Sequence, residues 1–441
     1  MVALLRRPGG AAPLLTGLAL GLACCSPAAD EAPADSVSGV RNLLLITVDT
    51  LRADHLGTYG YPRPTSPHLD RFAEQAVVFD AAQSSSSWTL PGIASIMTSF
   101  YTSTHGCWNG RSRLAPSFET LAERLHAAGW RTGAVVNHVF LARDYGLDQG
   151  FEDYDDALVE QTKEASHLAI TAPAVTEKGL AWLAARGERS DEPWFLWVHY
   201  FDPHQDYQPH PGISEAFGET APVDLYDGEI AFTDRYVGAL LGGLRELGLE
   251  RRTAVVVVAD HGEEFEEHGR TGHRHGLFAE VQRVPLLIRA PGCAPRRVAE
   301  AVSLVDLEPT VLELLGLQAP DETAGRSLVP ALEGRPLDSV PVLGELGFNT
   351  VTCESIVVDG WKLILDHGQE ARLLFDHGAD PVERFDVAAD HPDRARRLEQ
   401  ELRRMVERSA GWRAGHPAVE ELELTREYRQ RLKDLGYVED E

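Results

Sequence analysis

Asn42-Leu-Leu-Leu-Ile-Thr-Val48, followed at once by Asp49, is the segment from which the architecture of this chain can be worked out. Its residues form a nearly unbroken apolar run of strand length, without the alternation typical of a strand that faces water on one side. Such a run predicts a strand buried on both faces of its sheet, as in parallel sheets covered by helices. The strand ends at an acidic residue.

Three later segments repeat the pattern of a buried strand that ends in polar residues. They are Gly133–Val136 before Asn137 and His138, Trp194–Val198 before His199, Asp202 and His204, and Ala254–Val258 before Asp260 and His261. Amphipathic helical patterns lie between them, at Phe118–Ala128 and Asp227–Leu247. This order predicts an α/β fold with a large, mostly parallel central sheet flanked by helices. Because such sheets bind ligands beyond the carboxyl ends of their strands, the four strand ends predict one shared site.

The pattern changes from about Leu337 onward. Short strand-like segments at Ser355–Val358, Trp361–Leu365 and Arg372–Phe375 are separated by Asp-Gly and His-Gly turns, which predicts a small antiparallel sheet. Charged amphipathic helices are predicted over 393–407 and 420–435, and we interpret them as solvated covers. We therefore expect a large domain over residues 41–336 and a C-terminal subdomain over residues 337–441.

The charge balance limits the possible partners. Lys and Arg number 41 against 68 Asp and Glu, which gives a net charge of −27. A surface this acidic repels nucleic acid, so we expect no nucleic-acid partner. An anionic substrate would need a strong local cation, which an acidic metal cluster can hold. Outside the leader, Cys107, Cys293 and Cys353 show no metal-binding spacing, and we expect them to be small buried residues.

The first residues have the layout of a secretory leader. Arg6 and Arg7 precede an apolar stretch from Ala11 to Ala23, which at 13 residues is shorter than the roughly 20 that a membrane-spanning helix needs. Residues 1–24 are therefore predicted to be a signal peptide. The end at Leu22-Ala23-Cys24-Cys25 resembles a bacterial lipoprotein cleavage site, and residues 25–40 are predicted to be a flexible tether.

This leader predicts export to the periplasm or cell surface, with membrane contact only through a lipid on Cys24 or Cys25. Ordinary cleavage and release remains the alternative. Failure of radiolabelled palmitate to label the protein would exclude lipidation.

The segment from Ser84 to Thr98 carries a candidate nucleophile. Pro91 suits the first turn of a helix, which predicts Thr89 or Leu90 just outside that helix. A hydroxyl at this place would face free backbone N–H groups and the positive end of the helix dipole, which stabilise an alkoxide and an oxyanion. The alternative is that Thr89 is a simple helix N-cap.

Four segments, in chain order, resemble the motifs of the sulfatase family of the alkaline-phosphatase superfamily. They are Val48–Tyr61, Trp88-Thr-Leu-Pro91 with Thr98 and His105-Gly106, Trp197-Val-His-Tyr-Phe-Asp-Pro-His204, and Ala259-Asp-His-Gly-Glu-Glu-Phe265 with Glu267-His-Gly269. The likeness runs over roughly residues 40 to 437. It implies an alkaline-phosphatase-like fold.

The resemblance also implies the roles of several residues. Asp49, Asp260 and His261 would bind one divalent cation with Thr89 as a further ligand, and carboxylates with one imidazole suit Ca, Mn, Mg or Zn. Such a cation would lower the pKa of the hydroxyl and neutralise charge on the ester. His204 would protonate the leaving oxygen, and His275 would be a basic substrate contact.

Other candidates receive a weaker functional interpretation. His268 is more simply a structural residue. A second metal site from Asp202, Asp206 and His210 is possible in principle, but surface acids explain these residues equally well.

The sequence departs from the sulfatase pattern at three positions. Thr89 stands where typical sulfatases carry a Cys or Ser that becomes formylglycine, Ile93 stands at the Arg position, and Thr50 replaces the second Asp of a pair. Thr nucleophiles resemble those of phosphodiesterases and of phosphoethanolamine or phosphoglycerol transferases. We therefore expect a hydrolase of anionic esters that favours phosphoesters or phosphodiesters. Sulfate-ester hydrolysis, group transfer at the cell surface, and a catalytically dead anion-binding lipoprotein stay open, as does the oligomeric state.

Overall fold

A computed structural model describes residues 39–161, 170–186, 191–348, 351–417, 421–423, 425–426 and 429–430. The predicted signal peptide, nearly all of the predicted tether and most of the helix predicted over 420–435 lie outside these residues. All of these described residues belong to one compact unit. No helix in the described residues is long and apolar enough to cross a membrane.

The central sheet has eight strands in the order β10-β2-β9-β6-β1-β5-β3-β4. Their bounds are β1 Asn42–Val48, β2 Val77–Gln83, β3 Arg131–Val135, β4 Asp153–Asp155, β5 Trp194–Tyr200, β6 Thr253–Ala259, β9 Leu286–Arg289 and β10 Arg296–Ser303. Only β9 runs antiparallel to its neighbours, β2 and β6, and the other pairs are parallel. The predicted α/β fold with a large, mostly parallel sheet is confirmed, and the four predicted strands are β1, β3, β5 and β6.

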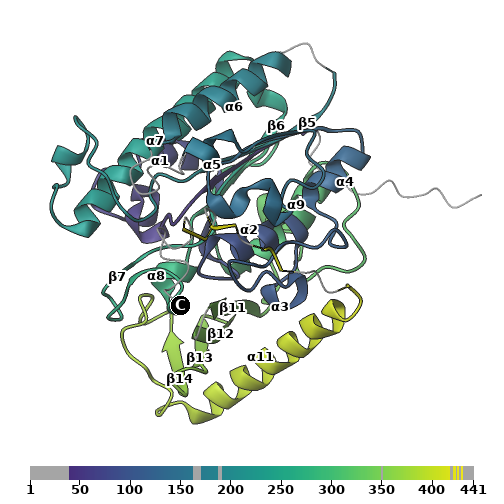
Figure 1. Cartoon of the computed structure of the whole chain (residues 1–441). Coiled ribbons are helices and arrows are strands. Elements are labelled where there is room, and N and C mark those ends of the chain that lie inside the picture. The colour runs from purple at the N-terminus through teal and green to yellow at the C-terminus, as the bar shows by residue number, and fades with distance from the viewer. Residues whose placement is uncertain are drawn as a thin grey trace, which may run out of the picture. The chain divides into compact units, whose positions relative to one another are not determined.

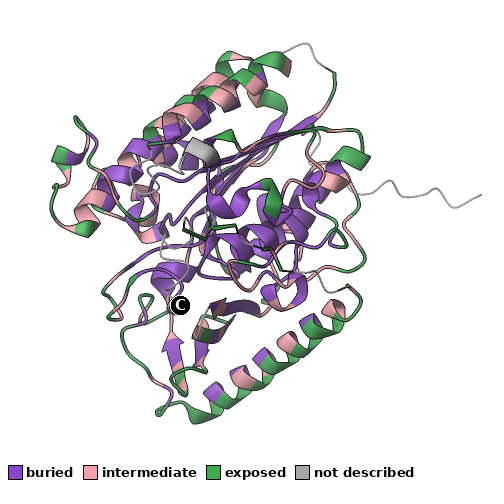
Figure 2. Ribbon diagram, viewed as in Figure 1, coloured by how far each residue is buried: buried purple, intermediate pink, exposed green. Residues whose placement is uncertain are grey.

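Helices cover both faces of this sheet (Figure 1). One group consists of α1 Pro67–Ala73, α6 Ala172–Arg186 and α7 Pro222–Glu246, and the other of α2 Thr89–Thr98, α4 Leu121–Ala127 and α9 Leu307–Leu314. Every residue of β1, β5 and β6 is buried, and the centre of Figure 2 is accordingly purple. Burial on both sides explains why these strands lack alternation.

The ends of two predicted helices differ from the sequence pattern for local reasons. The helix predicted from Phe118 begins at Leu121, because Thr120 caps it in a reciprocal capping box with Glu123. The helix predicted from Asp227 begins earlier, at Pro222, whose fixed φ suits the first helical position.

Shorter elements connect the main ones. They are α3 Thr102–His105, α5 Ala157–Gln161, α8 Ala279–Gln282, α10 Val329–Leu332, the hairpin strands β7 Glu264–Phe265 and β8 Thr271–Gly272, and the 3-10 turns η1 Ala53–His55, η2 Gly57–Tyr59, η3 Val139–Leu141, η4 Arg143–Tyr145, η5 Ser214–Ala216, η6 Glu250–Arg252 and η7 Leu304–Asp306. Cys107 and Cys353 are buried, Cys293 is half-buried, and all three are free thiols.

A second sheet forms the C-terminal part of the chain. It is antiparallel, in the order β11-β12-β13-β14, with bounds β11 Val342–Phe348, β12 Val351–Val358, β13 Trp361–Asp366 and β14 Ala371–Asp376. The three predicted segments are confirmed as strands, and β11 is a fourth that the sequence did not single out. Helix α11, Pro392–Arg413, contacts β12, β13 and α3. Its own residues Leu398, Leu402 and Met405 are buried.

Candidate active site

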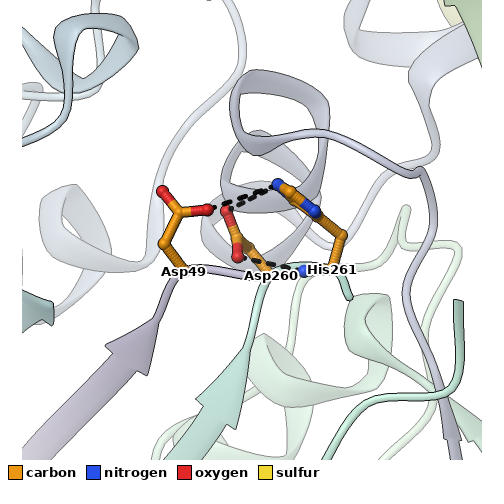
Figure 3. Close-up of side chains that lie close together, drawn as sticks. All are labelled: Asp49, Asp260 and His261. Atoms are coloured by element: carbon orange, nitrogen blue, oxygen red, sulfur yellow. Dashed lines mark hydrogen bonds and ion pairs between the residues drawn. The ribbon is translucent and has the colours of Figure 1, made fainter. Parts of the chain in front are cut away.

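Strand register brings the two candidate carboxylates together. Val48 of β1 pairs with Ala259 of the adjacent parallel strand β6, so Asp49 and Asp260 leave the sheet side by side. In Figure 3 both strands end at these residues, and the carboxylates point toward each other and toward the ring of His261. Among the described residues, Asp49, Asp260 and His261 form the one group of His, Cys, Asp or Glu whose ligand atoms have metal-binding spacing, all within 4.8 Å of one another.

The ring of His261 is oriented by its own loop. Its Nδ1 lies 2.8 Å from the carbonyl oxygen of Gly262, so an N–H at Nδ1 donates to that carbonyl and leaves the lone pair of Nε2 for the cluster. Nε2 lies 3.4 Å from Oδ1 of Asp49 and 3.6 Å from Oδ2 of Asp260. This is the tautomer that a metal ligand requires.

Thr89 joins this cluster from α2. Its Oγ1 lies 3.4 Å from Nε2 of His261. The position predicted for it needs a correction, because Thr89 is the first residue of α2 and Trp88 is the N-cap. Pro91 is the third helical residue, one that still needs no intrahelical N–H bond, so the helix starts two residues before it. Thr89 is thus not the helix N-cap.

Gly92 lets the first turn of α2 approach the end of β6. A Cβ added at this residue would lie 2.9 Å from the backbone oxygen of Asp260 and 3.4 Å from its Cβ. A side chain would therefore push Thr89 away from the carboxylates. The absence of a side chain at residue 92 sets how close the hydroxyl comes to the cluster.

The cluster is fully buried, and burial disfavours the charged forms of its carboxylates. Asp49, Thr89, Asp260 and His261 have no exposed surface. Burial, with the neighbouring carboxylates of Asp260 and Glu263, raises the pKa of Asp49 well above its ordinary range, and burial also raises the pKa of Asp260. Oδ1 of Asp49 and Oδ2 of Asp260 have no hydrogen-bond partner. Two orphaned carboxylate oxygens beside an imidazole lone pair form a donor set that fits a divalent cation.

A chain of hydrogen bonds through Trp197, Thr47 and His199 ends at the carboxylate of Asp49. Nε1 of Trp197 donates to Oγ1 of Thr47 over 2.9 Å, and that oxygen lies 2.8 Å from Nδ1 of His199. Because the carboxylate of Asp49 accepts from Nε2–H of His199, with Oδ2 3.3 Å away, Nδ1 of the neutral ring accepts the hydroxyl proton of Thr47. His199 thereby occupies one carboxylate oxygen and leaves the other for the cluster.

Further histidines surround the cluster. Nε2 of His138, which follows β3, lies 3.9 Å from Oδ2 of Asp49. The ring of His204 stacks on Phe201 at 4.6 Å and lies 5.7 Å from the ring of His138 and 5.0 Å from that of His273. Burial lowers the pKa of His138 well below its ordinary value and that of His199 to about 3, so both are neutral. The structure therefore places His204 beside the cluster, in the same group of rings.

The segment around the predicted His275 contributes different residues. The ring of His273 lies 4.6 Å from that of His261, and its Nδ1 lies 2.8 Å from the buried carboxylate of Glu263. Burial, then the neighbouring His261 and Arg274, lower the pKa of His273. His275 itself pairs with Glu264 at 3.0 Å and its side chain is 41% exposed. The structure does not bring it to the cluster.

Arg274 is the functional candidate that sequence reasoning missed. It is 9% exposed, has a left-handed backbone with φ +77, and its guanidinium lies 5.0 Å from the ring centre of Phe348. Its charge lowers the pKa values of His138, His261 and His273, which are lowered mainly by burial, so it lies within the field of the site. Ile93, at the position where an Arg was expected, is fully buried in the core. The sequence signal that could have identified Arg274 is its place between two histidines, in His273-Arg-His275.

The remaining candidates make structural contacts. His268 stacks on Phe278 at 3.8 Å and pairs with Glu280 at 2.6 Å. Asp202 accepts hydrogen bonds from the backbone N–H and hydroxyl of Thr171, at 2.9 Å and 2.6 Å. His210 pairs with Glu229 at 2.6 Å. In the part of the chain that the structure describes, Asp202, Asp206 and His210 are not brought together as a second metal site.

The chain is similar in sequence to known sulfatases. A family model described as Sulfatase matches residues 41–317. Human arylsulfatase A is 28% identical over 376 residues, covering 73% of this chain and 71% of its own.

Two solved structures show the same fold. The phosphonate monoester hydrolase of Agrobacterium radiobacter superposes with a TM-score of 0.66 at 21% identity, covering 86% of this chain and 96% of its own. A protein solved with its substrate D-glucosamine-2-N,6-O-disulfate has a TM-score of 0.70 at 17% identity, covering 86% of this chain and 99% of its own. The large sheet, its helices and the small antiparallel sheet are thus those of an alkaline-phosphatase-like fold.

Proposed function

The chain belongs to the sulfatase family, whose members hydrolyse esters, and we propose that it does so by covalent catalysis from Thr89 with a preference for phosphoesters. One observation carries the proposal. The hydroxyl of Thr89 lies 3.4 Å from Nε2 of His261, where two buried carboxylate oxygens lack partners. A buried hydroxyl at such a place is suited to nucleophilic attack.

Asp49, Asp260 and His261 would hold a divalent cation, with Thr89 as a fourth ligand. When bound, the cation would neutralise the two carboxylates, lower the pKa of the Thr89 hydroxyl and offset charge on the ester oxygens. The residues do not discriminate between Ca, Mn, Mg and Zn.

The chain's own side chains carry the remaining steps. Oγ1 of Thr89 bonds to phosphorus and loses its proton to solvent, while the bond to the leaving oxygen breaks and His204 protonates that oxygen. A water then bonds to phosphorus and returns a proton to His204, and Oγ1 of Thr89 leaves with a proton from solvent. Arg274 supplies positive charge to the ester, a role that Ile93 cannot fill.

The preference for phosphorus rests on the chemistry of Thr89. A threonine is not converted to formylglycine, so a threonyl sulfate would have no hemiacetal route for expelling sulfate, whereas a phosphothreonine can be attacked at phosphorus. The phosphonate monoester hydrolase of similar fold is compatible with this preference. Sulfate-ester hydrolysis remains the second candidate, because human arylsulfatase A is among the similar proteins.

Turnover of bis(4-nitrophenyl) phosphate and 4-nitrophenyl sulfate by the purified protein tests both candidates. The Thr89→Ala variant is expected to lose roughly 10³-fold or more in turnover, the kind of loss seen when a covalent nucleophile is removed. Acid-quenched wild type is expected to show a phosphoryl adduct on Thr89 in intact-mass and peptide spectra.

Thr98→Ala is the matched control. Thr98 lies in the same helix and its hydroxyl only donates to the backbone oxygen of Ala94 over 2.7 Å, so turnover should persist. Full activity of Thr89→Ala would refute the mechanism. Hydrolysis of the sulfate alone, without a phosphoryl adduct, would replace the phosphoester preference with the sulfate reading.

A further inference from the structure

A strained turn follows Asp49 directly. The backbone of Thr50 is left-handed, with φ +53, a conformation that a β-branched residue rarely adopts. Thr50 is fully buried, and its hydroxyl has no hydrogen-bond partner among the described residues, so its own side chain does not hold the turn. Strained backbone persists only where neighbouring groups fix it. A group that fixes this turn also limits where the carboxylate of Asp49 can point.

The hydroxyl of Tyr226, in the second turn of α7, holds the strained turn at two points. It donates to the backbone oxygen of Thr50 over 2.6 Å and accepts from the backbone N–H of Arg52 over 2.9 Å. Tyr226 has no exposed surface, and burial raises the pKa of its hydroxyl well above the ordinary value, so the hydroxyl keeps the proton that it donates. One phenol thus pairs both backbone groups that span the turn.

The side chain of Arg52 extends this restraint to the loop after β6. Its Nη1 donates over 3.0 Å to the backbone oxygen of Glu263, two residues beyond His261. Asp54 accepts two hydrogen bonds from the same guanidinium, of 2.9 Å and 2.8 Å, and so fixes its orientation. Arg52 therefore joins the segment after Asp49 to the segment after His261.

The ring of Tyr226 packs between the same two segments. Its centre lies 5.2 Å from the ring of His55, which follows β1 in the chain, and 4.9 Å from the ring of Phe265, which follows β6. These contacts involve the ring alone, so a phenylalanine at residue 226 would keep them. The two hydrogen bonds of the hydroxyl can therefore be removed without removing the packing.

We infer that Tyr226 is a positioning residue of the cation site, which holds Asp49 at its present distance from His261. It acts through the turn at Thr50 and through Arg52. The inference deepens the proposed function, on which it rests for the presence of a cation. Oδ1 of Asp49 lies 3.4 Å from Nε2 of His261, a separation that lets both atoms bind one ion. Without the hydroxyl, the left-handed backbone of Thr50 is no longer paired, and the two ligands are free to move apart.

Tyr226→Phe and a control of the same kind test the inference. The control is Tyr154→Phe, in the edge strand β4, where another buried tyrosine hydroxyl donates to the backbone oxygen of Leu141 over 2.6 Å. Each variant loses one buried hydroxyl and keeps its ring. Affinity for Mn and for Ca is measured by isothermal titration of protein first stripped with a chelator, and thermal unfolding is measured on the same samples.

Tyr226→Phe is expected to bind the cation about tenfold more weakly than wild type, the order of loss that follows removal of a group that orients a metal ligand. Tyr154→Phe should bind the cation like wild type. Both variants should unfold at a lower temperature, because each leaves a buried backbone oxygen without its donor. A merely structural role of Tyr226 would lower the unfolding temperature without lowering the affinity.

Equal cation affinity of Tyr226→Phe and wild type would overturn the inference, and so would an equal loss in both variants. Crystal structures of chelator-treated wild type and Tyr226→Phe give a second measurement. The distance between Oδ1 of Asp49 and Nε2 of His261 is expected to be longer in the variant, and an unchanged distance contradicts the inference. If wild type binds no cation, the proposed cation site fails, while these two distances still decide whether Tyr226 positions Asp49.

Discussion

The two carboxylate oxygens of Asp49 have different surroundings. Oδ2 lies 3.3 Å from Nε2 of His199, whose other nitrogen is fixed by Thr47, whereas Oδ1 has no hydrogen-bond partner. A carboxylate held on one side in this way keeps its free oxygen pointed at the cluster. We therefore expect His199 to be a positioning residue that acts through Asp49.

Replacing His199 should weaken cation binding at the cluster. In His199→Leu the support of Asp49 is lost, and affinity for the bound divalent cation is expected to fall by roughly 10- to 100-fold, the usual effect of removing such a partner. Isothermal titration with Ca, Mn, Mg and Zn salts measures this.

His199→Gln is the informative partner variant. Its amide nitrogen can replace Nε2 as a donor to Asp49, so it should recover part of the affinity. If the Leu and Gln variants bind the cation as wild type does while both stay folded, His199 does not position Asp49.

Helix α2 positions the nucleophile through the closeness of its first turn to β6. Gly92→Ala places a Cβ 2.9 Å from the backbone oxygen of Asp260, a contact that neither backbone can relieve without moving. A shift of about 1 Å in a reacting group can cost roughly 100-fold, so kcat/KM of Gly92→Ala should fall by about 10- to 100-fold.

Gly242→Ala, within α7, is the control for the same substitution. A Cβ at residue 242 meets nothing within 4 Å, and alanine is the better helix former, so stability should rise by roughly 0.5–1 kcal/mol with activity unchanged. Thermal unfolding and kcat/KM are measured for both variants. An active Gly92→Ala would show that α2 has room to move at its first turn.

The C-terminal sheet is joined to the rest of the chain by a buried acid. Glu345 of β11 is 1% exposed and accepts a hydrogen bond of 2.8 Å from the backbone N–H of Ser103 in α3. Burial raises the pKa of Glu345 from 4.5 to about 7. Folded protein therefore keeps this proton up to near pH 7, while unfolded chain releases it near pH 4.5.

Between these pH values the folded state binds more protons, so this residue makes the free energy of unfolding fall as pH rises. In Glu345→Gln that contribution is absent. The stability of the variant relative to wild type should therefore increase from pH 4.5 to pH 7, by an amount on the order of 2–3 kcal/mol. Urea unfolding at several pH values with a chelator present measures the difference, and Glu246→Gln, at an exposed position of α7, should show none.

Much of the fold and part of the site followed from local sequence. Buried strands appear in the sequence as unbroken apolar runs, and parallel strands end at one edge of the sheet. Asp49, Asp260, His261 and His204 could therefore be expected near one another from the sequence alone. The segment near His275 was also identified, but the residue was not, because sequence order cannot tell which of three neighbouring side chains faces inward. β11 was missed since its two glycines interrupt the alternation of an antiparallel strand.

Chain order and hydrophobic pattern were enough to establish a parallel sheet with a polar site at its carboxyl edge, because those properties depend on neighbours in sequence. Only the tertiary structure decided that His199 lies against Asp49, that Arg274 lies within the field of the site while Ile93 is buried in the core, and that Gly92 brings Thr89 close to the end of β6. Each of these depends on distances between segments far apart in the chain, and such distances are set by strand register and by the close approach at Gly92.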